Sequence, residues 1–174
     1  GLSSPTYGTL KVGRVYSFSN ELIGQYDPSG GSYAFSLLGT SSTFGGGLGF
    51  TEMARYNTAI QYLYEYEKLF HAGVMAQIGG FGMGNGSMGA YQLNVGFSFA
   101  GLSVDAVYAY SRNAIALSTF TPVLPAGWTP QSLKATYGNQ RAIQLLAKYK
   151  YENLTVSGGY QQTLITNPSL GDQY

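Results

Sequence analysis

The stretch YQLNVGFSFAGLSVDAVYAY, residues 91–110, decides the fold. In its first half, large apolar side chains occupy the odd positions and small or polar ones the even positions. After Ala100–Gly101 the alternation resumes, with large side chains at the even positions from Leu102 to Tyr110. Alternation with period two is typical of a β-strand that has one apolar and one polar face. We therefore predict a β-hairpin with a tight turn at Ala100–Gly101.

The same alternation recurs on both sides of this hairpin. Further strands are predicted over 7–16, 54–66, 70–78, 141–151 and 154–161, which makes seven, with tight turns at Glu67–Lys68 and Glu152–Asn153. The longer connections, rich in Gly, Ser, Pro or Asn, lie at about 17–50, 79–89, 112–139 and 164–174. Short turns at one end and long loops at the other are typical of an up-and-down antiparallel meander. We expect one domain over 1–174, with a strand at 7–16, a long loop at 17–50, a six-strand meander over 54–163 and a last loop at 164–174.

The composition excludes several classes of protein. Only 10% of the 174 residues are charged, and the chain holds 25 Gly and 16 Tyr, which argues against a helical bundle. A content of 44% hydrophobic residues is too high for a disordered chain, and no apolar run is long enough for a transmembrane helix. A net charge of +1 gives no basic footprint for nucleic acid. The absence of Cys excludes disulfides, thiolate zinc sites and cysteine nucleophiles.

The two faces of the predicted strands indicate a membrane barrel. The apolar face carries aromatic residues towards the strand ends, as in the interfacial girdles of membrane barrels; we predict this lipid-facing girdle from Tyr62, Tyr64, Phe97, Phe99, Tyr108, Tyr110, Tyr149 and Tyr151. The polar face is predicted to line a water-filled pore through Gln61, Glu65, His71, Gln77, Gln92, Asn94, Asp105, Gln144, Lys148 and Lys150. Ten residues rising ~3.3 Å each at a tilt of about 45° span roughly 23 Å, close to the apolar band of such barrels. A soluble β-sandwich binding module is the alternative, in which the apolar face would be buried.

Two segments carry a resemblance to a known family. GTLKVGRVYS at 8–17, followed by a long Gly-rich segment, and ARYNTAIQY at 54–62 together resemble the general bacterial porins. The resemblance implies a homotrimeric channel in the bacterial outer membrane, with a barrel of about sixteen strands in contact with lipid. Ions and small hydrophilic solutes would diffuse through a pore narrowed by an inward-folded loop, without any cofactor.

The resemblance also implies residues for the pore constriction. Arg14 and Arg55 would be the bases of the wall, and Glu21 and Asp27, the only carboxylates between Ser17 and Phe50, would be the acids of the loop. In this family the wall bases and the loop acids face each other and produce an electric field across the constriction. The loop here lacks the dense acidic cluster of better-known members, which argues for a weaker field. The charged residues of the polar face give the wall a small cationic excess, which would raise the local concentration of anions.

The side chain of Arg14 raises a conflict in this assignment. Arg14 has the parity of Leu10 and Val12, which are interpreted as lipid-facing, and an Arg near the bilayer midplane costs roughly 2–4 kcal/mol. Either a bulge at Gly13 reverses the parity, or the strand has the opposite sense and Lys11 faces the lumen. We favour the bulge, because Gly is a natural bulge residue.

Two further expectations concern chain length and chemistry. Seven strands are too few to close such a barrel, and exposed edges are not tolerated in lipid, so we expect an internal piece of a porin, about half of it. His71 is the only histidine and has no Cys partner, so neither a metal site nor an enzyme is predicted. A substrate-specific barrel, or one with a structural or adhesive role, remains an alternative to the diffusion channel.

Overall fold

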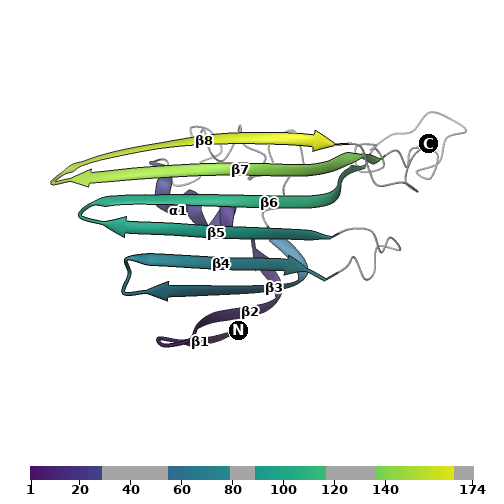
Figure 1. The fold of residues 1–174 in the computed structure, drawn as a ribbon, viewed down its shortest axis with the longest axis horizontal. Helices are drawn as coiled ribbons and strands as arrows, with labels where there is room; N and C mark the ends of the chain where they lie inside the picture. The colour runs from purple at the N-terminus through teal and green to yellow at the C-terminus, as the bar shows by residue number, and fades with distance from the viewer. Residues whose placement is uncertain (29–54, 79–88, 117–135, 167–174) are drawn as a thin grey trace, which may run out of the picture.

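The strands form a single antiparallel sheet in which each strand pairs with its neighbours in sequence (Figure 1). The computed structural model describes residues 1–28, 55–78, 89–116 and 136–166. Its strands are β1 (Leu2–Ser4), β2 (Gly8–Tyr16), β3 (Arg55–Tyr66), β4 (Phe70–Gln77), β5 (Ala90–Phe99), β6 (Leu102–Ala116), β7 (Thr136–Tyr151) and β8 (Leu154–Thr166). The predicted all-β, up-and-down architecture is confirmed. The described sheet has eight strands rather than seven, because Leu2–Ser4 adds a short strand against β2.

The described sheet is open, with β1 and β8 at its two edges. No helix in the described ranges has the length and apolar character needed to span a bilayer.

The connections at one end of the sheet are the tight turns that the sequence predicts. Glu67, Lys68, Ala100 and Glu152 all have positive φ, as does Gly101 at +84°. In the turns at 67–68 and 100–101 two consecutive residues have positive φ, which matches the right-handed twist of the paired strands and is why such turns close hairpins. A Cβ at Gly101 would overlap the carbonyl oxygen of Lys150, so only glycine fits there.

The hairpin of β6 and β7 is longer than predicted. Pairing continues beyond Ser111↔Gln140 through Ile115↔Gly138, with register shifts on the way. Because the register shifts here, the sequence does not keep a strict period of two, and the pattern therefore predicts a loop over residues 112–139. The remaining residues of the predicted loops, 29–54, 79–88, 117–135 and 167–174, lie outside the described part of the chain.

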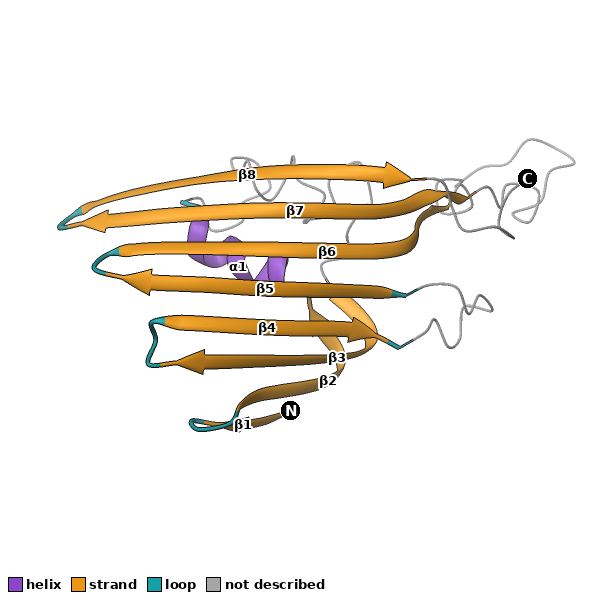
Figure 2. Ribbon diagram, viewed as in Figure 1, coloured by secondary structure: helices purple, strands orange, loops and turns teal. Residues whose placement is uncertain are grey.

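A helix, α1 (Phe18–Tyr26), follows β2 directly and lies on one side of the sheet (Figure 2). The Ser17 hydroxyl accepts a hydrogen bond from the Asn20 backbone N–H at 3.1 Å, which caps the N-terminus of the helix. Phe18, Leu22 and Tyr26, spaced by four residues, are buried on its single apolar face. We call the sheet face against which α1 packs the inner face, and the opposite one the outer face.

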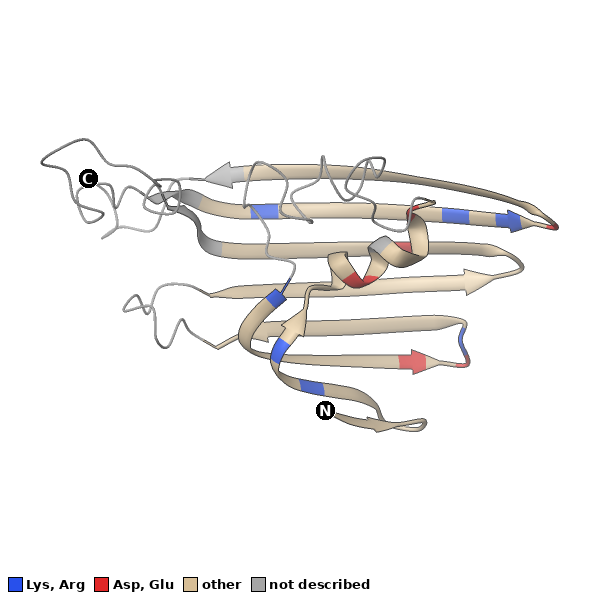
Figure 3. Cartoon of the chain, turned by 180° about the vertical axis from the view of Figure 1, so that it is seen from behind, with Lys and Arg blue, Asp and Glu red and all other residues tan. Residues whose placement is uncertain are grey.

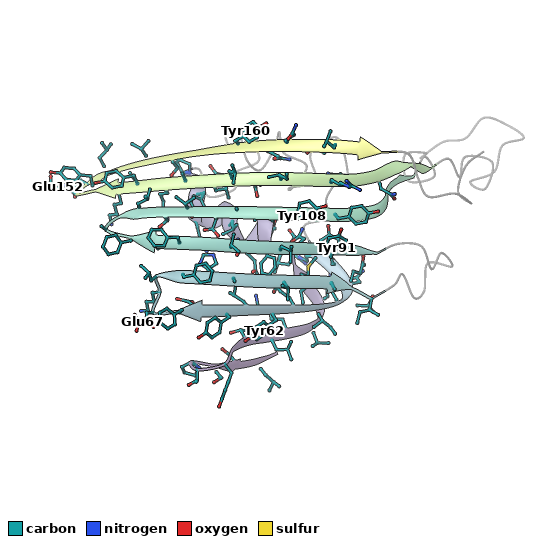
Figure 4. All side chains as sticks on the ribbon, in the orientation of Figure 1. Tyr62, Glu67, Tyr91, Tyr108, Glu152 and Tyr160 are labelled. Carbon is teal, nitrogen blue, oxygen red and sulfur yellow. The ribbon has the colours of Figure 1, made fainter. Side chains whose placement is uncertain are left out.

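The outer face is apolar and exposed, whereas the inner face is polar. Leu93 and Leu145 on the outer face are 48% and 46% exposed, whereas their neighbours Gln92 and Gln144 on the inner face are at most 2% exposed. Figure 4 shows side chains on both faces of the strands, among them Tyr62, Tyr91, Tyr108 and Tyr160, all of which occupy outer-face positions. A soluble sandwich would bury the leucines and expose the amides, which is the reverse of this arrangement.

A β-bulge interrupts the pairing of β2 with β3. Between the pairs Gly13↔Ala59 and Val15↔Tyr56, β2 contributes one residue and β3 contributes two, Asn57 and Thr58. Thr58 has a φ of 50°, as a bulge residue often does. The irregularity falls at Gly13, as predicted, and Gly13 has a φ of 106°. The extra residue lies in β3, however, so β2 keeps its alternation and the predicted reversal of its parity is wrong. The alternation reverses in β3 instead, so Tyr56 is buried on the inner face rather than exposed on the apolar one.

Candidate functional site

Helix α1 crosses the inner face and is fixed to the strands at its N-terminus. The Phe18 backbone N–H, which has no partner within the helix, donates a hydrogen bond of 2.8 Å to Oε1 of Gln92 on β5. The Phe18 ring lies against Gly73 of β4, so closely that a Cβ on Gly73 would overlap the ring. A buried amide and a glycine on neighbouring strands therefore position the start of the helix.

The C-terminus of α1 is fixed by a buried carboxylate. The Tyr26 hydroxyl donates to Oδ2 of Asp105 at 2.6 Å, while Oδ1 lies 2.9 Å from Nδ2 of Asn94 and 2.7 Å from Nε2 of His71. The Asp105 residue is only 2% exposed, so these three contacts replace the water that a carboxylate would otherwise bind. Burial and the bond to Asp105 raise the pKa of Tyr26 above its ordinary value, so its hydroxyl remains a donor at neutral pH.

Two lysines of the strands make polar contacts with the helix. Nζ of Lys11 on β2 lies 2.6 Å from a carboxylate oxygen of Glu21. Nζ of Lys148 on β7 donates to the Gln25 carbonyl oxygen at 2.9 Å and lies 5.4 Å from the centre of the Tyr26 ring. A cation at the carbonyl end of a helix is favourable because that end carries partial negative charge. Lys11 and Lys148 are therefore basic residues of the strands that contact α1.

The predicted loop acids are both in or next to α1. Glu21 is in the helix and pairs with Lys11. Asp27 directly follows the helix and is buried, with 8% of its surface exposed.

The predicted wall bases Arg14 and Arg55 lie where β2 and β3 leave the plane of the sheet. The C-terminal end of β2 and the N-terminal end of β3 turn across the inner face, behind β4 and β5 in Figure 1 and in front of them in Figure 3. Because of this turn, the Tyr56 hydroxyl reaches Oγ of Ser111 on β6, at 3.3 Å. The two strand ends therefore lie over the inner face rather than in the wall.

The side chain of Arg55 lies on the opposite side of β3 from the one that unbroken alternation from Gln61 predicts. Tyr56 points towards the sheet, so Arg55 points away from it, and its guanidinium lies 4.6 Å from the centre of the exposed Tyr16 ring. Arg14 alternates with buried Val15 and is exposed on the same side. Because the strand ends have turned inward, this side no longer continues the outer wall, which resolves the conflict over the parity of Arg14.

The residues predicted to line the pore are all on the inner face, by the register of their strands. Five of them, Gln61, Gln92, Asn94, Asp105 and Gln144, are buried. These five therefore do not face open water as expected: Gln61 meets the Tyr16 carbonyl at the end of β2, and α1 contacts Gln92 and Asp105. Five others are not buried: Glu65, His71, Gln77, Lys148 and Lys150.

The predicted girdle residues all occupy outer-face positions. Tyr62, Tyr64, Phe97, Phe99, Tyr149 and Tyr151 are exposed, and Tyr108 and Tyr110 are partly exposed.

A polar pocket of about 250 Å³ lies between α1 and strands β3 to β5. Its lining includes the carboxylates of Glu21 and Glu65, His71 and Asn94. Within the described residues no group of three or more potential metal ligands comes together. The described lining of this pocket therefore offers polar, charged and apolar side chains to a solute.

The sequence prediction missed α1, together with the roles of Lys11, Tyr26 and Lys148 in fixing it. A signal for the helix is present, in Ser17 followed by Phe18, Leu22 and Tyr26 at helical spacing. The contacts that fix it join residues up to 123 positions apart, and a local pattern does not contain them.

The antiparallel meander with an apolar outer face, and the helix bound to its polar inner face, define part of the wall of a transmembrane β-barrel. A family model described as Gram-negative porin matches residues 1–170. The chain belongs to this family, which is one of channels rather than of enzymes. The comparison with curated proteins gave no match.

Proposed function

We propose that this chain forms the wall and the constriction of an outer-membrane channel, through which ions and small hydrophilic solutes diffuse passively. The assembled channel is a homotrimer with its outer face in contact with lipid. The proposal is supported by membership of the porin family and by the distribution of polar and apolar side chains between the two faces.

The observation that carries the proposal is the attachment of α1 to the inner face. A helix bound at both ends by buried polar side chains narrows the space beside the wall without closing it. Since Gln92 and Asp105 serve this purpose, we assign them to holding the constriction and not to contact with solutes. Solutes would instead meet the exposed charges of Arg14, Arg55, Glu65 and Lys150, and the partly exposed Lys148.

Arg14 and Arg55 are proposed to favour anions at the constriction. Both are exposed on the inturned strand ends and point away from the sheet. Fixed cations beside a narrow aqueous path raise the local anion concentration and slow the passage of cations.

The test is to record the full-length channel in a planar bilayer under a salt gradient. We expect stable, non-saturating conductance, and a reversal potential that shifts towards cations when Arg14 and Arg55 are both replaced by Ala. Replacing both with Lys should restore the wild-type potential, because the charge is retained. An unchanged reversal potential in the Ala variant would remove both residues from the constriction, and saturable, blockable currents would favour the substrate-specific alternative.

A further inference from the structure

The outer face carries an isolated cation that the channel proposal does not use. Among the described side chains of β4 to β8, Arg141 is the one charged residue at an outer-face position. It is exposed on β7, between Tyr110 of β6 and Leu164 of β8. A charge on a lipid-facing wall is unfavourable unless it lies near the membrane surface or has a partner.

Three tyrosines surround this cation on the same face. The Arg141 guanidinium lies 6.0 Å from the centre of the Tyr110 ring. The Tyr91 ring stacks on that of Tyr110 with centres 5.0 Å apart, and it lies 6.1 Å from the ring of Tyr108. We call Arg141, Tyr91, Tyr108 and Tyr110 the outer-face cluster. Four side chains with N–H or O–H donors are thus concentrated on a mainly apolar surface, with Gln162 of β8 nearby on the same face.

The position of the cluster along the strands corresponds to a membrane interface. The outer-face positions of β7 are, in order, Arg141, Ile143, Leu145, Ala147, Tyr149 and Tyr151. The distance from Arg141 to Tyr151 is ten residues, or roughly 23 Å along the membrane normal for strands that rise ~3.3 Å per residue at a tilt of about 45°. This is close to the height of the apolar band, so the two aromatic groups flank it at opposite surfaces. At such a surface an Arg is far less unfavourable than at the bilayer midplane.

The cluster lies on the side of the longer connections, whereas Tyr149 and Tyr151 lie near the tight turn. In outer-membrane barrels the short turns are periplasmic and the long loops extracellular. This orientation places the cluster at the outer leaflet.

We infer that the outer-face cluster binds the phosphate group of an anionic glycolipid of the outer leaflet, of the lipid A type. A guanidinium pairs with a phosphate through two parallel hydrogen bonds, and tyrosine hydroxyls at headgroup depth add further donors. Ile143 and Leu145, below the cluster, are exposed and offer an apolar surface to the acyl chains. The inference rests on the membrane orientation within the proposed function, but not on conduction or selectivity.

The test compares binding of diphosphorylated lipid A and of its dephosphorylated form to the folded, full-length protein in detergent, measured by native mass spectrometry. We expect the wild-type protein to prefer the phosphorylated lipid. Arg141→Gln should weaken lipid A binding about tenfold, the size of effect typical of losing a hydrogen-bonded charge pair. The affinity of Arg141→Lys for lipid A should lie between those of the wild type and Arg141→Gln, and Tyr91→Phe should weaken binding less than Arg141→Gln does. The matched control is Lys68→Gln, which removes a positive charge at the tight-turn end and should bind lipid A as the wild type does.

Either of two outcomes would overturn the inference: a wild-type protein without preference for the phosphorylated lipid, or an Arg141→Gln variant that binds it as tightly as the wild type. If Arg141→Gln is only less stable in phosphatidylcholine and keeps the wild-type lipid preference, Arg141 serves to pack on Tyr110. That result would also overturn the inference. If Arg141→Gln does not fold, lipid A binding by Arg141→Lys and Tyr91→Phe still tests the inference: wild-type affinity in both variants would overturn it. Conductance in phosphatidylcholine bilayers, measured on the same samples, tests the channel separately.

Discussion

Asp105 shows how one residue on a barrel strand can determine where a loop lies. Its carboxylate is almost completely buried and receives hydrogen bonds from Tyr26, Asn94 and His71, which belong to α1, β5 and β4. A carboxylate buried in this way is stable only while its partners remain in place, so helix docking and carboxylate solvation depend on each other. Gly96 makes this arrangement possible, because a Cβ there would overlap both the His71 ring and the Asp105 carboxylate.

Replacing Tyr26 with Phe should weaken the attachment of α1. The variant keeps the buried ring and removes only the hydroxyl, which leaves Asp105 one donor short at a cost of about 1–3 kcal/mol. We expect faster amide hydrogen exchange over residues 18–26 and noisier single-channel currents. Tyr7→Phe is the control, since Tyr7 is 76% exposed and distant from the helix in the structure. Equal exchange in the two variants would mean that the bond to Asp105 does not hold the helix.

At the scale of elements, the strands could be predicted from the sequence because alternation with period two is a local property. The predicted turn at Ala100–Gly101 and the assignment of Leu93 and Leu145 to the apolar face agree with the structure. The bulge at Thr58 was not predictable in this way, because nothing in ARYNTAIQY marks an extra residue. This bulge explains why Tyr56 and Arg55 lie on the opposite sides of the strand from those that unbroken alternation predicts, because every residue before a bulge changes face.

The candidate site was predictable only in part, for a related reason. Parity places a residue such as Gln92 on the inner face, but it does not show what covers that face. The hydrogen bond between Gln92 and Phe18 joins positions 74 residues apart, and such a contact arises from the folding of the loop. The sequence therefore predicted an open polar wall where the structure has one covered by α1.

Helix α1 as an element depends on the space that Gly73 leaves for Phe18. Gly73→Ala would place a methyl group inside the Phe18 ring, and overpacking of this kind typically costs about 1–3 kcal/mol. We expect the folded full-length protein in detergent to unfold at a lower temperature and its conductance to change. Gly158→Ala is the matched control, because nothing lies within 4 Å of a Cβ at that position. If both variants unfold at the wild-type temperature, the packing of Phe18 on β4 contributes little to stability.

At the scale of the whole molecule, the sheet has the polarity of a barrel wall that separates lipid from water. A band of aliphatic residues on the outer face is flanked by aromatic side chains at both ends, and the inner face carries most of the amides and charges of the described strands. These 174 residues contain no Cys, so a single cysteine introduced here is the one thiol in this part of the protein.

The most direct test of this account is the quenching of single-site fluorophores by bromine-labelled lipids in the full-length protein. Labels should be attached to cysteines at Leu93 and Leu145 on the outer face, and at Gln161 on the inner face beside Gln144. We predict strong quenching at Leu93 and Leu145 by bromines deep in the acyl chains, and none at Gln161, where a water-soluble quencher should act instead. Strong lipid quenching at Gln161 together with none at Leu93 and Leu145 would contradict the account.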